Sequence, residues 1–412
     1  MSTGQPEPLS YWQATAPPGP GGDDLPATAG VAVIGGGVLG SSAAYWLARD
    51  GVRPVLLEQE AIGYGATGRN GGFVGVGAAA YYPTVVADFG HDAARTIWGI
   101  TVDNKELVRR LVAEEELDCQ YREPGTLGLV LGDADLAEAR RGVDALRADG
   151  HDVELLNREQ VQELVLTPLG PDIVAASWRR SGGLVHSGRY VRGIARAAQR
   201  HGARICTGIR VSGLEPRGVG VVVHTTRGDL EAGAVIVAVN AWTDTLVPAL
   251  RGVIVPVRGQ MLAYAPLPPV FTTGLGASYT PTGEYWHQTV DGSIVLGGCR
   301  ADATGQDVDV REGVPTDEVQ ESLERVFPRL FPELRDLRVE RRWGGLMAFT
   351  RDYLPVAGPA QDLPGVWMAG GFSGSGMPFG VRVGQLLAEA ATTGATPPAL
   401  QPLRHDRPTL RA

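Results

Sequence analysis

Three spaced glycines after a short apolar run constrain the fold of this chain more than any other feature of its sequence. The run Val31–Ile34 is bounded by glycines, as expected of a parallel strand that is buried on both faces. Gly35, Gly37 and Gly40 follow and open a predicted helix over residues 38–50, whose apolar side chains share one face. This order predicts the first strand and helix of a βαβ unit with the G-x-G-x-x-G motif.

The same unit supplies the chemistry of a nucleotide site. Gly35 permits a tight turn, Gly37 lets the backbone approach a pyrophosphate, and Gly40 lets helix and strand pack closely. Free N–H groups and the dipole at the start of the helix attract phosphate charge. The next apolar run, residues 54–57, ends at Glu58, near the spacing of about 20 residues at which an acid binds ribose hydroxyls. We therefore predict a dinucleotide site. The alternative is a glycine-rich turn in an unrelated α/β protein, since the chain contains 57 glycines.

Charge and cysteine usage exclude several classes of partner. A formal net charge of −9 argues against nucleic acids and anionic membranes, which bind basic faces. The three cysteines are widely spaced, which favours reduced thiols, and the seven histidines show no metal-ligand spacing. The sequence shows no secretory signal and no apolar stretch long enough to span a bilayer. We expect a cytoplasmic protein without a metal site, a transmembrane segment or a nucleic-acid partner.

Helical and strand patterns alternate along the rest of the chain, which predicts two interleaved domains, one α/β and one α+β. Residues 1–29 are expected to form an N-terminal leader, rich in Pro, Gly and Asp over its second half. The expected Rossmann-type domain, with a parallel sheet, covers residues 30–85, 180–252 and 340–400. The expected substrate domain, with a mixed or antiparallel sheet, covers residues 86–179 and 253–339.

Further motifs extend over nearly the whole chain. The glycine-rich segment EQEAIGYGATGRNGGF, residues 58–73, continues directly from the acid. The other motifs are Ser10-Tyr11-Trp12, GLVHSGRYVRGIARAAQRHGA, Ile209-Arg210-Val211, Asn240-Ala241-Trp242, Pro256–Gln260, Gly344-Gly345 with Thr350 and Asp352, and Gly370–Gly380. In these motifs the sequence resembles the FAD-dependent D-amino-acid oxidase superfamily. It looks most like the branch that contains γ-glutamylputrescine oxidase, with glycine and sarcosine oxidases and D-amino-acid dehydrogenases as more distant relatives.

The resemblance implies that FAD is the cofactor. The loop after Glu58 would follow the pyrophosphate up to the flavin, and the turn Gly370–Gly380 would direct backbone N–H groups at the electron-rich edge of the ring. The implied FAD-binding residues are Gly35, Gly37, Val38, Leu39, Gly40, Glu58, Gln59, Ala66, Thr67, Arg69, Asn70, Gly71, Gly72, Val211, Asn240, Ala241, Trp242, Gly371, Gly374, Ser375, Gly376 and Met377.

We expect the FAD to be bound non-covalently. Some relatives attach it through a His or Cys near the flavin, but the loop 61–73 contains neither residue and the segment 343–352 contains no Cys. Cys299, in the substrate-side sheet, is the one thiol that this reasoning leaves open as an attachment point.

A departure from the family pattern favours an amine substrate over a simple α-amino acid. In glycine oxidase-like relatives an arginine a few residues before the T-x-D motif binds the substrate carboxylate, and Met347 occupies that position here. A thioether cannot pair with a carboxylate. Arg300 is the main candidate for a compensating cation, with a surface ion pair as its alternative role. Arg258 and Arg382 are weaker candidates.

Three more residues complete the expected substrate site. The tyrosine that contacts substrate in the relatives matches Tyr285. His287 lies two residues on and on the same strand face, where it either tunes the pKa of the substrate amine or packs as a structural histidine. Ser375 stands where relatives often carry a histidine between two glycines, which removes a charged group. The expected catalytic residues are therefore Tyr285, His287, Arg300, Met347 and Ser375.

The predicted reaction oxidises the C–N bond of an amine or amino acid to an imine by hydride transfer to flavin N5. The acceptor that reoxidises the flavin is left open between O2 and another compound. Several oxidases of the superfamily hold a lysine over the flavin, whereas the only lysine here, Lys105, falls in a charged helix where we expect it to be solvated. Two alternatives remain: an aromatic-hydroxylase-type flavin monooxygenase, whose late Gly-Asp pair is missing here, and a non-catalytic FAD-binding protein.

Overall fold

Two eight-stranded sheets organise residues 8–411, the part of the chain that this computed structural model describes. The first sheet has the strand order β17 (Val356–Pro359), β18 (Val366–Gly370), β11 (Gly228–Val237), β1 (Thr28–Ile34), β2 (Val55–Glu58) and β8 (Arg204–Thr207). From β18 to β8 all neighbours are parallel, and β17 is antiparallel to β18. The strands β10 (Gly220–Thr225) and β9 (Val211–Arg217) extend β11 as an antiparallel hairpin.

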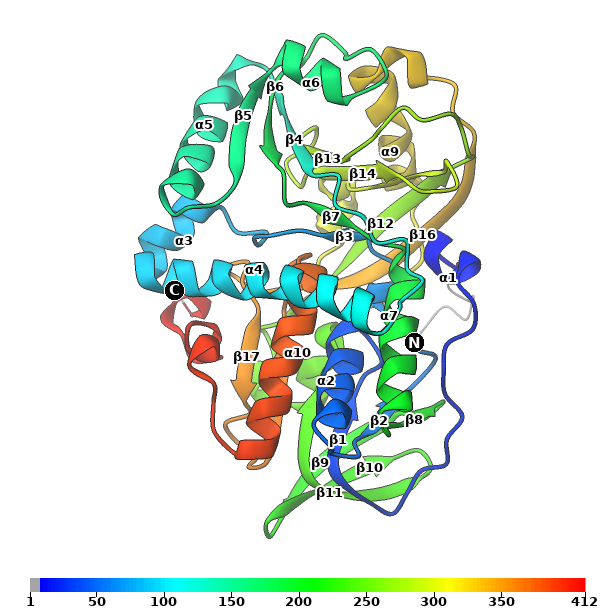
Figure 1. The fold of residues 1–412 in the computed structure, drawn as a ribbon, viewed down its shortest axis with the longest axis vertical. Coiled ribbons are helices and arrows are strands. Elements are labelled where there is room, and N and C mark those ends of the chain that lie inside the picture. Colours follow the sequence, from blue (N-terminus) through cyan, green and yellow to red (C-terminus); the bar gives the residue numbers. More distant parts are fainter. Residues whose placement is uncertain (1–7, 412) are drawn as a thin grey trace.

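Helices cover the parallel sheet, whose strands are apolar because both faces are buried. From Val31 to Ile34, the residues of β1 are at most 5% exposed. Helix α2 (Val38–Arg49) lies between α10 (Gly376–Thr393) and α7 (Ser187–Arg200), and α4 (His91–Glu114) crosses against α10 (Figure 1). Every residue of α2 from Val38 to Ala48 is buried, which explains why the helix is apolar around most of its circumference.

The second sheet is mixed. Its strand order is β16 (Val339–Phe349), β12 (Val255–Tyr264), β15 (Ile294–Gly297), β14 (Glu284–Gln288), β13 (Gly274–Ala277), β4 (Thr126–Leu131), β6 (Ile173–Arg179) and β5 (Val153–Asn157). Only β13 and β4 are parallel among these neighbours. Helix α9 (Asp317–Leu330) packs against one face of this sheet, where Phe327 contacts Trp286 and Phe271. The predicted combination of a Rossmann-type parallel sheet with a mixed second sheet is confirmed.

Further α-helices and strands lie outside or beside the two sheets. They are α1 (Tyr11–Thr15), β3 (Phe73–Val74), α3 (Tyr82–Phe89), α5 (Asp133–Ala148), α6 (Arg158–Leu164), β7 (Gly183–Leu184) and α8 (Thr243–Leu246). Strand β16 pairs with β12 along its length, so residues 340–349 belong to the second sheet, although the expected limit at position 340 assigns them to the Rossmann-type domain. The domain limits themselves stay a prediction.

The described residues lack a membrane-spanning helix and a cluster of metal ligands. Between residues 8 and 411 there is no helix with the length and apolar character needed to cross a membrane. The same residues contain no group of three or more His, Cys, Asp or Glu side chains placed to hold a metal ion. Residues 1–7 of the expected leader lie outside the described residues.

Candidate active site

A cavity of about 1330 Å³ is lined by residues from both sheets. Sites for drug-sized ligands have volumes of up to about 1,000 Å³, so this cavity has room for more than one small molecule. We name three parts of it by their lining residues. The nucleotide part includes Gly35, Gly37, Glu58, Thr67 and Val211; the central part includes Met261, Tyr285, Met347, Phe372 and Ser375; the distal arm includes Tyr82, Trp98, Val153, Ser177 and Arg179.

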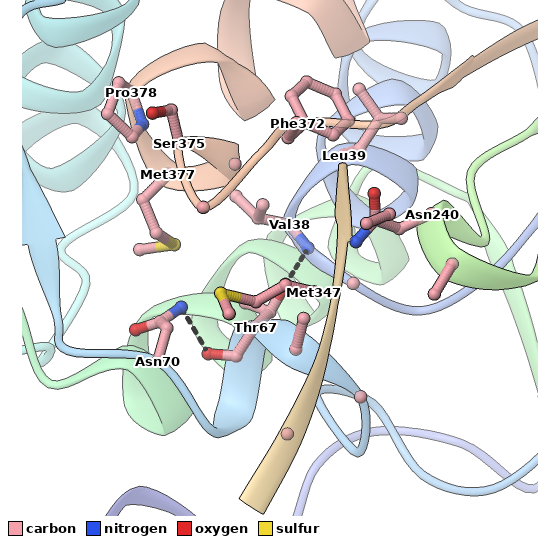
Figure 2. Close-up of a pocket in the computed structure, with 18 of the residues that line it drawn as sticks. Val38, Leu39, Thr67, Asn70, Asn240, Met347, Phe372, Ser375, Met377 and Pro378 are labelled. Carbon is pink, nitrogen blue, oxygen red and sulfur yellow. Dashed lines mark hydrogen bonds between the residues drawn. The ribbon is translucent and has the colours of Figure 1, made fainter. Parts of the chain in front are cut away.

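The turn before α2 shapes the nucleotide part. The N–H of Gly35 donates to Leu57 O at 2.8 Å, and its φ of 108° is one that residues with a side chain rarely adopt. A Cβ at Gly40 would stand 1.9 Å from Gly35 O, so only glycine fits there. The backbone N–H of Val38 donates to Thr67 Oγ1 at 3.0 Å, and no side chain caps the helix from Gly37 (Figure 2). The positive end of α2 therefore faces the cavity, as phosphate binding requires.

Glu58 ends β2 with its carboxylate fixed by two backbone donors. Oε2 accepts from Gly36 N–H at 2.6 Å and Oε1 accepts from Glu60 N–H at 2.8 Å. Burial raises the pKa of Glu58 above its usual value, although these two N–H groups act in the opposite direction. Each oxygen keeps a second lone pair for a ribose hydroxyl.

Asn70 organises the glycine-rich loop from both of its amide atoms. Its Oδ1 accepts from the N–H of Gly72 at 2.8 Å and from Ser187 Oγ at 2.6 Å, and its Nδ2 donates to Thr67 O at 3.0 Å. The last of these bonds is visible beside Met347 in Figure 2. These bonds link the loop to the start of α7 and hold it along the cavity.

Arg69 ties the same loop to the second sheet. It is 4% exposed, and its guanidinium donates to Tyr64 O at 3.0 Å and to Gly344 O at 3.1 Å. In return, Trp343 Nε1 donates to Arg69 O at 3.0 Å. Arg69 is therefore engaged with backbone carbonyls, a role that positions the cavity wall.

The N-terminus of α10 points into the central part. Gly374 has a φ of 87°, and Ser375, the residue at the helix start, does not cap it with its side chain. Buried Asn104 on α4 holds this end: its Nδ2 donates to Met377 O at 3.1 Å and its Oδ1 accepts from Val381 N–H at 2.9 Å. The helix dipole thus adds positive potential to the central part.

Tyr285 and Met347 line the central part from opposite regions of the second sheet. A Cβ at Gly297 would stand 2.6 Å from Tyr285 Oη, and a Cβ at Gly259 would stand 2.9 Å from Met347 Cε. These glycines give the two side chains their room. Burial raises the pKa of Tyr285 to about 12, so its phenol stays protonated at neutral pH and can donate a hydrogen bond.

His287 lies outside the cavity lining although it shares a strand with Tyr285. It is 1% exposed and stacks on Trp12, with ring centroids 5.8 Å apart. Burial, with a smaller contribution from Arg122, lowers the pKa of His287 to about 4, so the ring is neutral at physiological pH. The structure therefore shows a packed histidine and does not bring His287 together with Met347.

The three arginines proposed as carboxylate partners also lie outside the lining. Strand β15 ends at Gly297, and Cys299 has a left-handed φ of 54°, so the chain turns before Arg300. Arg300 donates to a backbone carbonyl at 3.0 Å. Arg258 forms an ion pair with Asp307 at 2.6 Å. Arg382, on α10, lies 3.3 Å from a carboxylate oxygen of Asp103. None of these three arginines faces Tyr285 across the cavity that the described residues form.

Most of the residues assigned to FAD line the cavity, including Gln59, Ala66, Gly71, Asn240, Ala241 and Trp242. Gly40, Gly72 and Gly371 do not, and the structure gives each a backbone role. Gly72 and Gly371 have φ angles of 77° and 68°. The N–H of Gly371 donates to Asn240 Oδ1 at 3.2 Å, which fixes the turn after β18.

Cys299 and Lys105 bear on covalent attachment and on oxygen. Cys299 is 0% exposed and does not line the cavity, and burial raises the pKa of its thiol. Lys105 is not solvated as expected: its side chain is 12% exposed and pairs with Glu123 at 2.7 Å, because the helix packs it toward that carboxylate. Lys105 does not line the large cavity.

Sequence reasoning missed several residues that build the site. Gly36 and Ser187 hold Glu58 and Asn70, and Asn104 holds α10. Ser177 and Arg179 line the distal arm. The sequence shows two adjacent arginines, Arg179 and Arg180, at the end of a strand. It does not show which of them lines a cavity, because that depends on the neighbouring strands.

Comparisons with known proteins agree with this geometry. Residues 30–390 match the family of FAD dependent oxidoreductases (DAO), and the chain belongs to this family. It is similar to the probable oxidoreductase OrdL of Rhizobium meliloti, 27% identical over 399 residues, which are 94% of this chain and 89% of that protein. It is also similar to the gamma-glutamylputrescine oxidoreductase of Escherichia coli, 27% identical over 374 residues, with 88% and 83% covered.

A solved structure extends the comparison to the fold. The glycine oxidase from Geobacillus kaustophilus superposes with a TM-score of 0.79 at 21% identity, covering 93% of this chain and 99% of that one. The chain is thus an FAD-dependent oxidoreductase, and the predicted resemblance is confirmed.

The residues of the cavity fit FAD. The fixed carboxylate of Glu58, the start of α2 and the N-terminus of α10 all line this one cavity, and they offer groups for a ribose, a phosphate and an electron-rich ring. When bound, FAD supplies the acceptor for two electrons. The particular FAD contacts of these residues stay predictions.

Proposed function

We propose that this oxidoreductase acts on the C–N bond of an amine and not on a simple α-amino acid. The charge distribution of the cavity carries this proposal. Within the described residues, the charged side chains that line it are Glu58, Glu60, Arg69, Arg179 and Arg210. Both glutamates and Arg210 belong to the nucleotide part, Arg69 donates to backbone carbonyls, and Arg179 belongs to the distal arm. The central part therefore lacks a cation that would pair with a carboxylate on the carbon next to the reacting nitrogen.

The names of the relatives support oxidation at a carbon–nitrogen bond without choosing between the two substrate classes. The Escherichia coli relative is named for an amine and the Geobacillus kaustophilus neighbour for an amino acid. Met347 supports the amine, because an uncharged thioether lies where the glycine oxidase-like pattern has an arginine.

The residues of the central part suit an amine that reacts in its neutral form. Met261, Met347 and Phe372 present apolar surface, and an apolar environment lowers the pKa of an ammonium group. The freed lone pair can then form the C=N bond as the hydride leaves the carbon. Tyr285, which stays protonated, donates a hydrogen bond that orients the substrate. Positive potential from α10 opposes the negative charge that reduction adds nearby.

The monooxygenase and the non-catalytic alternatives are not favoured. The similar proteins reported above are an oxidase and two oxidoreductases, and the family match covers most of the chain. Whether O2 or another compound accepts the electrons remains part of the proposal to be tested.

Anaerobic reduction tests the proposed substrate class. The purified FAD-loaded protein is mixed under nitrogen with putrescine and a γ-glutamyl amine, and separately with glycine, sarcosine, L-proline and D-amino acids. We expect one or more of the amines to bleach the visible absorbance of the oxidised flavin, and the α-amino acids to leave it unchanged. Faster bleaching by an α-amino acid than by every amine would overturn the proposal, and no bleaching by any compound would favour the non-catalytic alternative. Admission of air or a quinone afterwards identifies the acceptor.

A further inference from the structure

The face of the second sheet that bears Tyr285 continues as a row of small residues. Directly paired residues on adjacent strands share one face of a sheet. Starting from Tyr285 on β14, the row runs through Gly276 on β13, Gly128 on β4 and Ser177 on β6. A Cβ at Gly276 would contact only Glu284 O, and one at Gly128 only Ser177. The sheet therefore leaves space above these positions, between the central part and the distal arm.

The distal arm has apolar walls and a single charged group. Its walls include the side chains of Tyr82, Trp98, Val143, Leu146 and Val153. Ser177 and Arg179 are two residues apart on β6, so both point to the same face of the sheet. An extended ligand that passes over Ser177 therefore meets Arg179.

Arg179 lacks a partner, while the cations around it are paired. Within residues 8–411, Arg179 forms no ion pair and no side-chain hydrogen bond. By contrast, Arg180 pairs with Glu154 at 2.5 Å and Lys105 with Glu123 at 2.7 Å. Arg179 is exposed, and an arginine remains charged in proteins, so its guanidinium is open to an anion. A charged guanidinium that borders an apolar arm is a ready site for an anion.

We propose that Arg179 binds a carboxylate at the far end of an extended amine substrate. This rests on the proposed function for the reacting end, where the nitrogen lies beside Tyr285. Three strand spacings of about 4.8 Å separate Tyr285 from Ser177, which is roughly 14 Å. The substrate class is therefore an amine joined to a carboxylate by a chain of several methylene or amide groups, without a charge along the middle.

In this arrangement the substrate is recognised in the distal arm and oxidised in the central part of the cavity. A carboxylate in the distal arm selects and orients the substrate, and the central part stays free of charge so that the amine loses its proton. Arg179 thus binds the carboxylate far from the reacting nitrogen. The other candidates for this role lie outside the cavity lining; they are Arg300, Arg258 and Arg382.

A binding experiment tests Arg179 without any reaction. Straight-chain monocarboxylates of increasing length, which carry no amine, are titrated calorimetrically into the FAD-loaded protein. We expect the Arg179→Met variant to bind the best of them about 10- to 100-fold more weakly, in line with the loss of a charge-assisted pair. The control is Arg180→Met, which removes the neighbouring arginine, a residue that follows β6, packs over Trp178 and does not line the cavity. Arg179→Lys keeps the charge and is expected to lose less. Equal affinity in wild type and Arg179→Met would overturn the proposal, as would equal losses in Arg179→Met and Arg180→Met.

A kinetic experiment tests the substrate class. Anaerobic flavin reduction is measured with ω-amino carboxylates and with n-alkylamines of matched length. We expect the wild type to prefer the longer ω-amino carboxylates, and the ratio of rate constants between the two series to fall toward one in Arg179→Met. A preference that persists in Arg179→Met, or that is absent in the wild type, would contradict the role of Arg179. If no compound of either series reduces the flavin, the proposed function fails, and the calorimetric titration still decides whether Arg179 holds a carboxylate.

Discussion

Replacing Glu58 by Gln tests the nucleotide part of the cavity. The carboxylate accepts from Gly36 N–H at 2.6 Å and from Glu60 N–H at 2.8 Å. Glutamine has an NH2 group in place of one of the two carboxylate oxygens. That NH2 group cannot accept a hydrogen bond, so one of the two backbone N–H groups would lose its acceptor. The variant would also lose the negative charge that strengthens the expected hydrogen bond from a ribose hydroxyl.

The size of the effect follows from that lost interaction. A hydrogen bond to a charged group contributes about 1.5–3 kcal/mol, and each 1.4 kcal/mol corresponds to about tenfold in affinity. We therefore expect Glu58→Gln to raise the Kd of FAD about 10- to 100-fold. The Kd is measured by titrating apoprotein with FAD and following the fluorescence of the free cofactor. Glu231→Gln, at an exposed carboxylate on β11 that does not line the cavity, is the matched control.

The pH dependence gives a second readout of the same residue. Because burial raises the pKa of Glu58, its carboxyl takes up a proton at a higher pH in the folded protein than in the unfolded chain. Acidification through this raised pKa should weaken FAD binding and, by linkage, favour the folded apoprotein. Glu58→Gln should remove both effects. Unchanged FAD affinity in Glu58→Gln, or an equal loss in Glu231→Gln, would refute the reasoning.

Three further variants test the central part and the packing behind it. Met347→Arg places a cation in the central part, and we expect glycine to reduce the flavin at least about 10-fold faster than in the wild type; no gain in a variant that retains FAD would count against the role given to this position. Asn104→Ala leaves buried backbone groups of α10 unpaired, and urea unfolding should show a loss of about 1–3 kcal/mol. Arg407→Met leaves buried Asp352 without its partner at 2.6 Å, which should cost about 3–5 kcal/mol in the same assay, whereas a loss below about 1 kcal/mol would contradict the importance of that ion pair.

The sequence was sufficient to predict elements whose pattern is local. The expected strand Val31–Ile34 forms the second part of β1, and the helix expected over 38–50 runs from Val38 to Arg49. Glycines and apolar periodicity determine both, since the backbone near Gly35 and Gly40 leaves no room for a side chain. The class of cofactor could be predicted for the same reason, because the glycine-rich loop expected to bind it, residues 58–73, is contiguous in sequence.

The substrate side depends on long-range pairing and was predicted less well. Alternation along β14 places Tyr285 and His287 on one face, but Trp12 from the N-terminal segment covers His287. Arg300 is the main candidate for a carboxylate partner in the sequence, but the chain turns at the left-handed Cys299 just before it. The position of Arg179 at the cavity depends on the order of strands in the sheet, where β6 lies between β4 and β5. The residues near Arg179 in the sequence do not predict that order.

A single anaerobic turnover tests the central claim most directly. The FAD-loaded protein is mixed with less than one equivalent of an ω-amino carboxylate, and the carbonyl product is quantified by mass spectrometry against the amount of flavin reduced. The account predicts one molecule of carbonyl compound, formed by hydrolysis of the imine, for each flavin reduced, with the remote carboxylate intact. Flavin that stays oxidised, or that is reduced with loss of the carboxylate and without cleavage of the C–N bond, would contradict it.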